Sequence, residues 1–238
     1  MTTTALQRLF APFKKYLPGL VWKPIHNLAT AILTPILFSY RTGHFRSSLK
    51  MAAVDSHGTA LPWYTYPCID FLRARSFDGK NILEFGGGQS TFWWAAGRTR
   101  VVTLEGSREW HAKLAPLIPP NVDLFYVTDL CAQECIADVE RILSDLALKF
   151  DVIIIDGLHR YEMIDIACRY VAGNGAIICD DSEGYGFQSG FQDRGMNRVD
   201  FFGYAPGSVL PHCTSVFFST SSFLLEPHWQ IPAMAIRA

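Results

Sequence analysis

The sequence predicts an α/β domain with a seven-stranded, mostly parallel sheet, an antiparallel strand from a C-terminal hairpin, and helices on both faces. Three observations predict this fold. From about residue 78 to residue 180, short apolar runs alternate with segments whose apolar residues recur at helical spacing. A glycine-rich turn, EFGGGQS, joins the first apolar run to the segment after it. Beyond residue 181, two strand-like runs follow each other without a helix, which is typical of a Rossmann-like sheet with an antiparallel edge.

The first half of the alternating region contains three expected strands, at residues 81–85, 100–104 and 122–127. A helix is expected to open at Ser90, directly after the glycine turn, and to run to about Ala96. Ser107 is placed to cap the next helix. Glu109 lies in the first turn of that helix, where the helix dipole favours an anion.

The second half begins with a long helix, expected over residues 133–148 from its apolar spacing. Residues 152–155 form an unbroken apolar run, which is typical of a strand buried on both faces. A helix over residues 161–171 is expected to stop at Gly173 and Gly175, before a fifth strand at 176–179. The hairpin strands are expected within residues 199–207 and 213–225.

Composition narrows the class of protein. The chain has 238 residues, of which 49% are hydrophobic and 18% charged, so a large core can form and wholesale disorder is excluded. The net charge is −1 and no basic stripe stands out, so no nucleic-acid partner is expected. The six cysteines contain no zinc-like pair of pairs, so we expect reduced, mostly buried thiols and a cytoplasmic protein.

Residues 1–55 are expected to form an apolar, helical extension, followed by the α/β domain at residues 56–238. The longest clean apolar run, residues 28–39, is too short to cross a bilayer and contains Pro35. Lys14, Lys15, Lys23 and Arg41 are interspersed with the apolar runs. Two interpretations stay open: a helix packed on the domain, or a peripheral membrane anchor with basic residues flanking an apolar face.

Acidic residues follow the ends of the expected parallel strands. Glu105 comes at the end of the second strand, Asp129 after the third, Asp156 after the fourth, and Asp180 and Asp181 after the fifth. Ligands of open α/β sheets bind at the carboxyl ends of the strands, so these residues are expected to surround one site. Helix capping is an alternative for one or two of them, Asp129 above all, but no clear helix follows the last pair.

The glycine turn discriminates between ligands. A dinucleotide would place its pyrophosphate there and favours G-x-G-x-x-G, whereas the chain has E-F-G-G-G-Q-S, with Glu84 as an anion beside the phosphates. S-adenosylmethionine fits better, because its methionine portion carries positive charge and no phosphate. Gly86 and Gly88 would let that portion approach the backbone, and Glu84 would favour its positive end. Glu105 would accept hydrogen bonds from both ribose hydroxyls.

These motifs resemble those of class I S-adenosylmethionine-dependent methyltransferases, over roughly residues 78–225. The run from Glu84 through Gly86 and Gly88 to Ser90 resembles their first motif, E-x-G-x-G-x-S, and TLEGS with Glu105 resembles their ribose-binding acid. FDVIIIDGLHRYE and ICDDSEG resemble the fourth- and fifth-strand motifs of the small metal-dependent O-methyltransferases, a subset that includes the catechol and caffeoyl-CoA enzymes.

The chain departs from that subset at His159, where catechol methyltransferases carry a catalytic lysine, and at Asp181, where asparagine is common. The resemblance implies methylation of a small-molecule hydroxyl, with Asp129 among the cofactor-binding residues. Asp156, Asp180 and Asp181 would repel one another unless a cation bridges them, and their hard oxygen ligands suit Mg²⁺. His159 and Asp156 are then the candidate catalytic residues, with His159 as the base. A metal-free site, in which one carboxylate binds the cofactor and another is the base, is the alternative.

Other function classes stay open beside this one. One is a catalytically silent S-adenosylmethionine-binding or membrane-associated protein on the same fold, because a fold alone does not establish a function. Another is a dinucleotide-dependent oxidoreductase, against which the glycine turn argues. Trp63, Tyr64 and Tyr66, just before the α/β core, either close over the ligand or pack the extension on the sheet. The methyl acceptor and the oligomeric state stay open.

Overall fold

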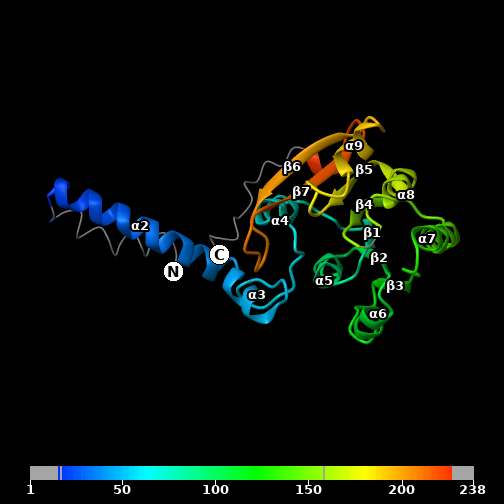
Figure 1. Cartoon of the computed structure of the whole chain (residues 1–238), viewed down its shortest axis with the longest axis horizontal. Coiled ribbons are helices and arrows are strands. Elements are labelled where there is room, and N and C mark those ends of the chain that lie inside the picture. Colours follow the sequence, from blue (N-terminus) through cyan, green and yellow to red (C-terminus); the bar gives the residue numbers. More distant parts are fainter. Residues whose placement is uncertain (1–15, 17, 158, 227–238) are drawn as a thin grey trace.

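The computed structural model of the protein describes residue 16, residues 18–157 and residues 159–226. A seven-stranded sheet in the order β3-β2-β1-β4-β5-β7-β6 forms its centre (Figure 1). The strands are β1 Asn81–Phe85, β2 Arg100–Glu105, β3 Val122–Tyr126, β4 Phe150–Ile155, β5 Val171–Cys179, β6 Asn197–Gly203 and β7 His212–Phe218. β1 to β5 are parallel, whereas β7 is antiparallel to both β5 and β6. The predicted Rossmann-like sheet with an antiparallel C-terminal strand is confirmed.

Helices cover both faces of this sheet. They are α4 Tyr66–Arg73, α5 Gln89–Ala95, α6 Arg108–Leu114, α7 Ala132–Leu146, α8 Met163–Tyr170, α9 Phe187–Gln192 and the 3-10 helix η1 Phe223–Leu225. One buried core lies between the sheet and α7, α8 and α9, and a second lies beneath α4, α5 and η1. β4 contributes to both cores: Ile153 and Ile155 face the first, and Val152 and Ile154 face the second, all fully buried. The expectation of a strand buried on both faces is confirmed.

The boundary between α8 and β5 differs from the prediction. The expected helix stop at Gly173 and Gly175 is wrong, because β5 begins directly after α8 and contains both glycines. Residues 150 and 152 of β4 pair with Val171 and Ala176, so the β5 segment between them bulges. A Cβ on Gly175 would lie 2.8 Å from the carbonyl oxygen of Asp151, which explains the glycine by close approach to β4.

α4 and α9 were not expected from the sequence. They have 8 and 6 residues, and neither follows a run of glycines or a capping serine of the kind that marked the equally short α5 and α6. Both are nevertheless well packed: α4 buries Cys68, Ile69 and Leu72, and α9 buries Phe187 and Phe191. Burial against the sheet therefore stabilises helices that the local sequence does not predict.

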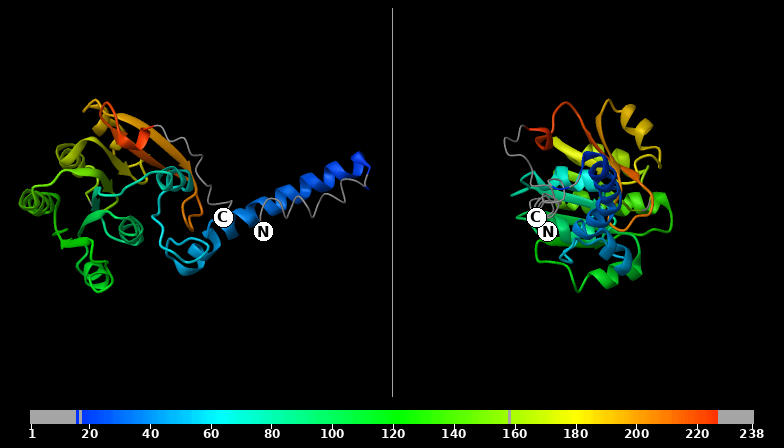
Figure 2. Two further views of the ribbon diagram at one scale, coloured as in Figure 1. Left: turned by 180° about the vertical axis from the view of Figure 1, so that it is seen from behind. Right: turned by 90° about the vertical axis from the view of Figure 1, so that its left-hand side faces the viewer.

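Two further helices precede the domain, α2 Gly19–Arg41 and α3 His44–Lys50. α2 projects away from the sheet in Figure 1 and in the left view of Figure 2, whereas α3 lies against the domain. His44 Nδ1 is 3.1 Å from the carbonyl oxygen of Ala205, in the β6–β7 connection. The projecting part of the predicted 1–55 extension is therefore α2. Lys14 and Lys15 lie outside the described residues, and within the described chain no helix has the length and apolar character to span a membrane.

Candidate functional site

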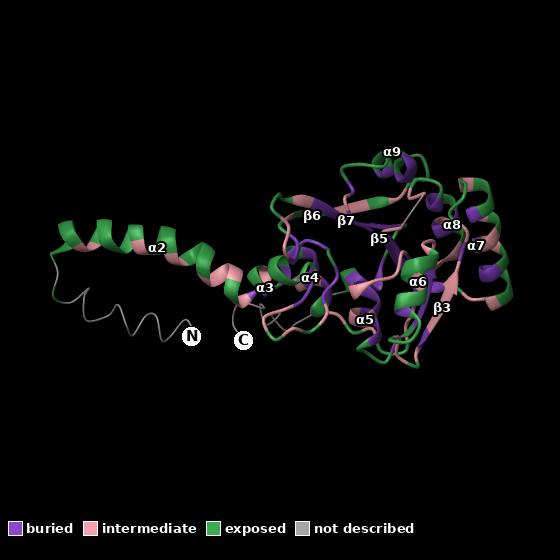
Figure 3. Ribbon diagram, turned by 60° about the horizontal axis from the view of Figure 1, so that its bottom comes forward, coloured by how far each residue is buried: buried purple, intermediate pink, exposed green. Residues whose placement is uncertain are grey.

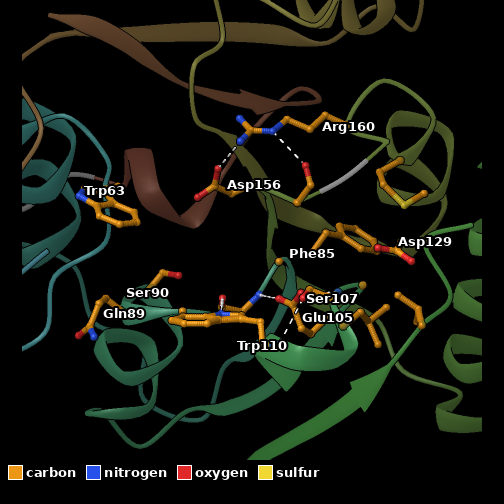
Figure 4. A pocket seen from close by; sticks show the side chains of 18 of the residues that line it. Trp63, Phe85, Gln89, Ser90, Glu105, Ser107, Trp110, Asp129, Asp156 and Arg160 are labelled. Atoms are coloured by element: carbon orange, nitrogen blue, oxygen red, sulfur yellow. Dashed lines mark hydrogen bonds and ion pairs between the residues drawn. The ribbon is translucent and has the colours of Figure 1, made fainter. Parts of the chain in front are cut away.

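A cavity of about 560 Å³ opens at the carboxyl ends of β1, β2 and β4 (Figure 4). This end of an open α/β sheet is where ligands bind, and small-molecule sites commonly measure ~300–1,000 Å³. The cavity is lined by six of the residues predicted from the sequence, which are Gly86, Gly88, Ser90, Glu105, Asp129 and Asp156. Four predicted residues are not part of its lining, namely Glu84, His159, Asp180 and Asp181.

The glycine turn between β1 and α5 is shaped by close packing. Gly86 has φ +94°, in the left-handed region, and a Cβ there would lie 2.7 Å from the carbonyl oxygen of Asp156. A Cβ on Gly87 would lie 2.9 Å from Cγ2 of Thr103. At Gly88 a Cβ would meet nothing within 4 Å, so this position faces open space. Gly86 and Gly87 therefore let the turn pack against β4 and β2, and the packing of Gly87 was not predicted.

Backbone N–H groups of the turn are used inside the protein. Their acceptors are the Leu104 carbonyl oxygen for Gly86 (2.9 Å), Glu105 Oε2 for Gly87 (2.8 Å) and Thr91 Oγ1 for Gly88 (3.0 Å). A turn that binds phosphate offers such N–H groups to the ligand. In this protein none of the three is left for a phosphate.

Glu105 is held at the end of β2 by two backbone hydrogen bonds. Its Oε2 accepts from the Gly87 N–H, and its Oε1 accepts from the Ser107 N–H at 2.7 Å. A carboxylate has about four lone-pair sites, so each oxygen can accept a further hydrogen bond. Ser107 also caps α6, as expected, by accepting from the Trp110 N–H at 3.2 Å. The Glu105 carboxylate is thus an oriented acceptor in the cavity wall.

Glu84 lies beneath the turn and not in the cavity. Its side chain is fully buried, and its Oε2 accepts from Thr91 Oγ1 at 2.5 Å and from Thr103 Oγ1 at 3.1 Å. Because Thr91 Oγ1 in turn accepts the Gly88 N–H, Glu84 supports the turn through Thr91. Burial raises the pKa of Glu84 to about 7. Glu84, expected to favour the positive end of the ligand, therefore lies beneath the turn and outside the cavity lining.

Asp156 faces the cavity from the end of β4 and pairs with Arg160, a residue not predicted from the sequence. Arg160 Nη2 lies 2.8 Å from Asp156 Oδ1, and Arg160 Nη1 lies 3.6 Å from Asp181 Oδ2. Arg160 also donates to the carbonyl oxygens of Gly157 (3.1 Å) and Asp180 (3.0 Å). Burial raises the pKa of Asp156, the nearby Asp180 raises it further, and Arg160 opposes them. An arginine four residues after an acid at a strand end was the signal that could have indicated this pair.

Asp180 and Asp181 also contact Arg160, and they gather with His212 of β7. Asp180 Oδ1 accepts from Thr214 Oγ1 at 2.6 Å and lies 3.4 Å from His212 Nε2. The nearby Asp180 carboxylate raises the pKa of His212. Ligand atoms of Asp180, Asp181 and His212 lie within 4.8 Å of one another. His212 joins the acids because β7 inserts beside β5, which the sequence does not reveal.

The three carboxylates predicted to hold Mg²⁺ do not surround a common position. The Arg160 guanidinium lies between Asp156 and Asp181 and already supplies the positive charge that the crowded acids need. Asp180 turns instead toward Thr214 and His212. The residues as arranged do not fit a divalent cation held by all three acids.

His159 does not line the cavity. Its backbone has φ 51°, in the left-handed region, and its carbonyl oxygen accepts from the Met163 N–H at 3.2 Å. Its Nε2 is buried and has no hydrogen-bond partner among the described residues. The structure therefore does not bring the predicted base together with the cofactor-binding residues.

Aromatic side chains complete the cavity rim. Trp110 donates from Nε1 to the Gly87 carbonyl oxygen at 2.7 Å, and Trp63 donates to the Pro206 carbonyl oxygen at 3.0 Å. Both line the cavity and are exposed (Figure 4). Tyr64 and Tyr66 are instead buried in the core. Of the aromatic segment, only Trp63 therefore faces the cavity, while the two tyrosines pack.

No protein-family model matches the chain, and no curated protein sequence matches it. Among solved structures, it is similar to precorrin-6y C5,15-methyltransferase from Geobacter metallireducens GS-15, with 17% identity and a TM-score of 0.48, over 65% of this chain and 87% of that one. A methyltransferase from Pyrococcus furiosus has 14% identity and a TM-score of 0.45, over 80% and 99%. A TehB-like SAM-dependent methyltransferase from Corynebacterium glutamicum ATCC 13032 has 13% identity and a TM-score of 0.44, over 67% and 89%.

At such identities a likeness concerns the fold alone. The sheet of this protein has the order β3-β2-β1-β4-β5-β7-β6 with β7 antiparallel. With helices on both faces, this is the Rossmann-like fold of class I S-adenosylmethionine-dependent methyltransferases.

Proposed function

We propose that the protein is an S-adenosylmethionine-dependent methyltransferase that acts on a hydroxyl of a small molecule. The observation that carries the proposal is the Glu105 carboxylate, fixed in the cavity wall beside the glycine turn. Two ribose hydroxyls would find an oriented carboxyl acceptor there, and charge-assisted hydrogen bonds are the stronger kind. Gly88 leaves open space for the methionine portion, while Ser90 and Asp129 line the same cavity.

The hydrogen bonds of the turn argue against a dinucleotide. A pyrophosphate needs free backbone N–H groups where the turn enters the helix. The N–H groups of Gly86, Gly87 and Gly88 already have acceptors inside the protein. A ligand that approaches this turn with hydroxyls and positive charge, and without phosphate, is therefore favoured over a nicotinamide cofactor.

Methyl transfer requires an acceptor oxygen that attacks the methyl carbon in line with the carbon–sulfur bond. The acceptor loses its proton, the new carbon–oxygen bond forms, and the electron pair of the broken bond goes to sulfur, which yields S-adenosylhomocysteine. We assign the proton to Asp156 and not to His159, because Asp156 lines the cavity and its pKa is raised toward neutral pH. The contact with Arg160 orients the Asp156 carboxylate.

The Mg²⁺ expected from the sequence is not part of this proposal. Arg160 pairs with two of the three acids that would have held it. Turnover is therefore expected to be the same in EDTA and in added Mg²⁺. Loss of turnover in EDTA with recovery in Mg²⁺ would restore the metal, held either by all three acids after Arg160 moves or by Asp180, Asp181 and His212.

Titration calorimetry with S-adenosylmethionine, S-adenosylhomocysteine and NAD tests the cofactor. We expect binding of the first two and none of NAD. Transfer of a radiolabelled methyl group to a panel of small phenols, catechols and sugars then tests the chemistry. Binding of both adenosyl compounds without transfer to any acceptor would favour the silent binding protein, and binding of NAD alone would reject the proposal.

A further inference from the structure

α2 carries an apolar surface that the described part of the molecule leaves uncovered over most of its length. Five apolar side chains are between 46% and 89% exposed, namely Leu20, Ile25, Leu28, Ile32 and Ile36. Figure 3 shows the helix standing clear of the domain and largely exposed along its length. Near its C-terminal end it does pack, where Phe38 meets Tyr66 edge-on with ring centroids 5.4 Å apart. Exposed apolar surface of this extent marks an interaction site.

The apolar residues of α2 lie on one side of the helix. Five polar residues, Lys23, Asn27, Thr30, Thr34 and Arg41, follow one another at spacings of four, three, four and seven residues. These spacings place them on one narrow stripe of an α-helix. The remaining, wider face carries the apolar residues, together with His26 and Ser39. A helix of this kind binds a flat boundary between an apolar and a polar medium better than a narrow groove.

The charge of this part of the chain is one-sided. Residues 1–54 contain seven of the 21 Lys and Arg residues and no Asp or Glu. All 22 acidic residues follow from Asp55 onward, beside 14 Lys and Arg, which gives that part a net charge of −8. A segment with only positive charge, such as residues 1–54, is attracted to an anionic surface. Two such segments side by side would bring like charges together, which disfavours pairing with a second copy.

We propose that α2 lies on the surface of an anionic lipid bilayer. Ile25, Leu28, Ile32 and Ile36 enter the boundary between headgroups and acyl chains, and Lys23 remains beside the lipid phosphates. The chain continues from α2 through α3 to Met51 and Ala52, which line the cavity. Docking would therefore bring the N-terminal wall of the cavity close to the bilayer. The interaction does not depend on the proposed methyltransferase activity.

Vesicle flotation with the full chain tests the proposal. Vesicles of phosphatidylcholine alone are compared with vesicles of phosphatidylcholine and phosphatidylglycerol. We expect the protein to float with the anionic vesicles, to float less with the neutral ones, and to be partly released from the anionic vesicles by salt. Absence of binding to the anionic vesicles overturns the proposal.

Two matched double variants locate the binding surface. Leu28→Gln with Ile32→Gln removes apolar side chains from the wide face, and Thr30→Gln with Thr34→Gln places the same residue at the same spacing on the polar stripe. The first pair is expected to lower the vesicle partition coefficient at least about tenfold, and the second to leave it within about twofold. Equal partition of the two variants overturns the proposal.

Charge is tested separately with Lys23→Gln and Lys50→Gln. Each is expected to weaken binding to the anionic vesicles about fivefold and to leave binding to neutral vesicles unchanged. Analytical ultracentrifugation without lipid tests whether a second copy of the chain binds this face instead. The proposal is overturned if the protein does not bind vesicles and instead forms a dimer that the Leu28 and Ile32 substitutions dissociate. The apolar face would then bind a second copy of the chain. Near-ultraviolet circular dichroism of every variant verifies that the domain is folded.

Discussion

Glu84 and Glu105 stand on two sides of the same glycine turn, and their surroundings give them different roles. Glu105 accepts two backbone N–H groups and keeps lone pairs for a ligand. Glu84 is fully buried and accepts hydroxyl hydrogen bonds from beneath. The first is therefore suited to the proposed ligand binding and the second to supporting the turn, although both are acids at the ends of neighbouring strands.

Replacing Glu105 with alanine is expected to weaken S-adenosylmethionine binding by about 1.5–3 kcal/mol, the value of a hydrogen bond to a charged group. Calorimetry with the purified variant measures this loss. Glu109→Ala is the matched control, because Glu109 is an exposed acid on α6 that pairs with Lys113. An affinity of Glu105→Ala equal to that of the wild type would show that the ribose lies elsewhere.

The raised pKa of Glu84 predicts a pH-dependent stability. Its pKa is raised from 4.5 to about 7 in the folded protein, so the folded state binds the proton more tightly than the unfolded state. The resulting stabilisation is complete below pH ~4.5 and is lost as the pH rises through ~7, an effect on the order of 3 kcal/mol. Urea unfolding from pH 5 to pH 8 should show this decline in the wild type and a smaller one in Glu84→Gln. Parallel curves for the two proteins would contradict it.

Asp156 and Arg160 predict a change in the pH dependence of turnover. Asp156→Asn removes the proposed base, and kcat is expected to fall by about 10²–10⁴-fold with little change in cofactor affinity. Arg160→Gln removes a charge that lowers the pKa of Asp156. The acidic limb of the kcat profile should then move to higher pH. A profile that Arg160→Gln leaves in place would remove Asp156 from the role of base.

At the scale of elements, the two helices of the N-terminal extension, α2 and α3, differ in how they contact the domain. α2 projects from the domain, whereas α3 contacts the β6–β7 connection through His44. Ser47 Oγ, also on α3, donates to the carbonyl oxygen of Val54 at 2.8 Å, which fixes the segment that leads to Met51 and Ala52 in the cavity wall. The two helices should therefore respond differently to truncation.

Removal of residues 1–41 is expected to leave S-adenosylmethionine affinity unchanged. Removal of residues 1–55 also deletes α3, Met51 and Ala52, so it should lower the affinity and reduce the free energy of unfolding by on the order of 2 kcal/mol. Calorimetry and urea unfolding of both truncated proteins measure the difference. Equal behaviour of the two would show that α3 has no part in the cavity.

At the scale of the whole molecule, ligand binding should stabilise the fold. A ligand that binds only the folded state adds about 2.7 kcal/mol at 100 times its Kd. For a chain of this length each kcal/mol raises the thermal midpoint by about 2–4 °C. Thermal unfolding should therefore shift upward by roughly 5–10 °C with saturating S-adenosylmethionine. The same concentration of NAD should produce no shift, and equal shifts would contradict the choice of ligand.

The sequence by itself determined the order and type of the main elements, the glycine turn and the acids at the strand ends. These are local properties: apolar periodicity marks a strand or helix, and the residue after a parallel strand must lie at the ligand-binding edge. Glu105 and Asp156 were therefore found from the sequence. α4 and α9 were not, because they are short and lack the sequence signals that marked the equally short α5 and α6, the glycine turn and the Ser107 cap.

Only the tertiary structure decided which of these acids share the cavity and which partners they take. The Glu84 side chain lies beneath the glycine turn because it accepts hydrogen bonds there from Thr91 and Thr103, which belong to two other elements. Arg160 lies between the acids of two strands, and His212 joins them because β7 inserts between β5 and β6. Such contacts depend on which distant segments become neighbours. Long-range packing sets this, and it leaves no periodic signal in the local sequence.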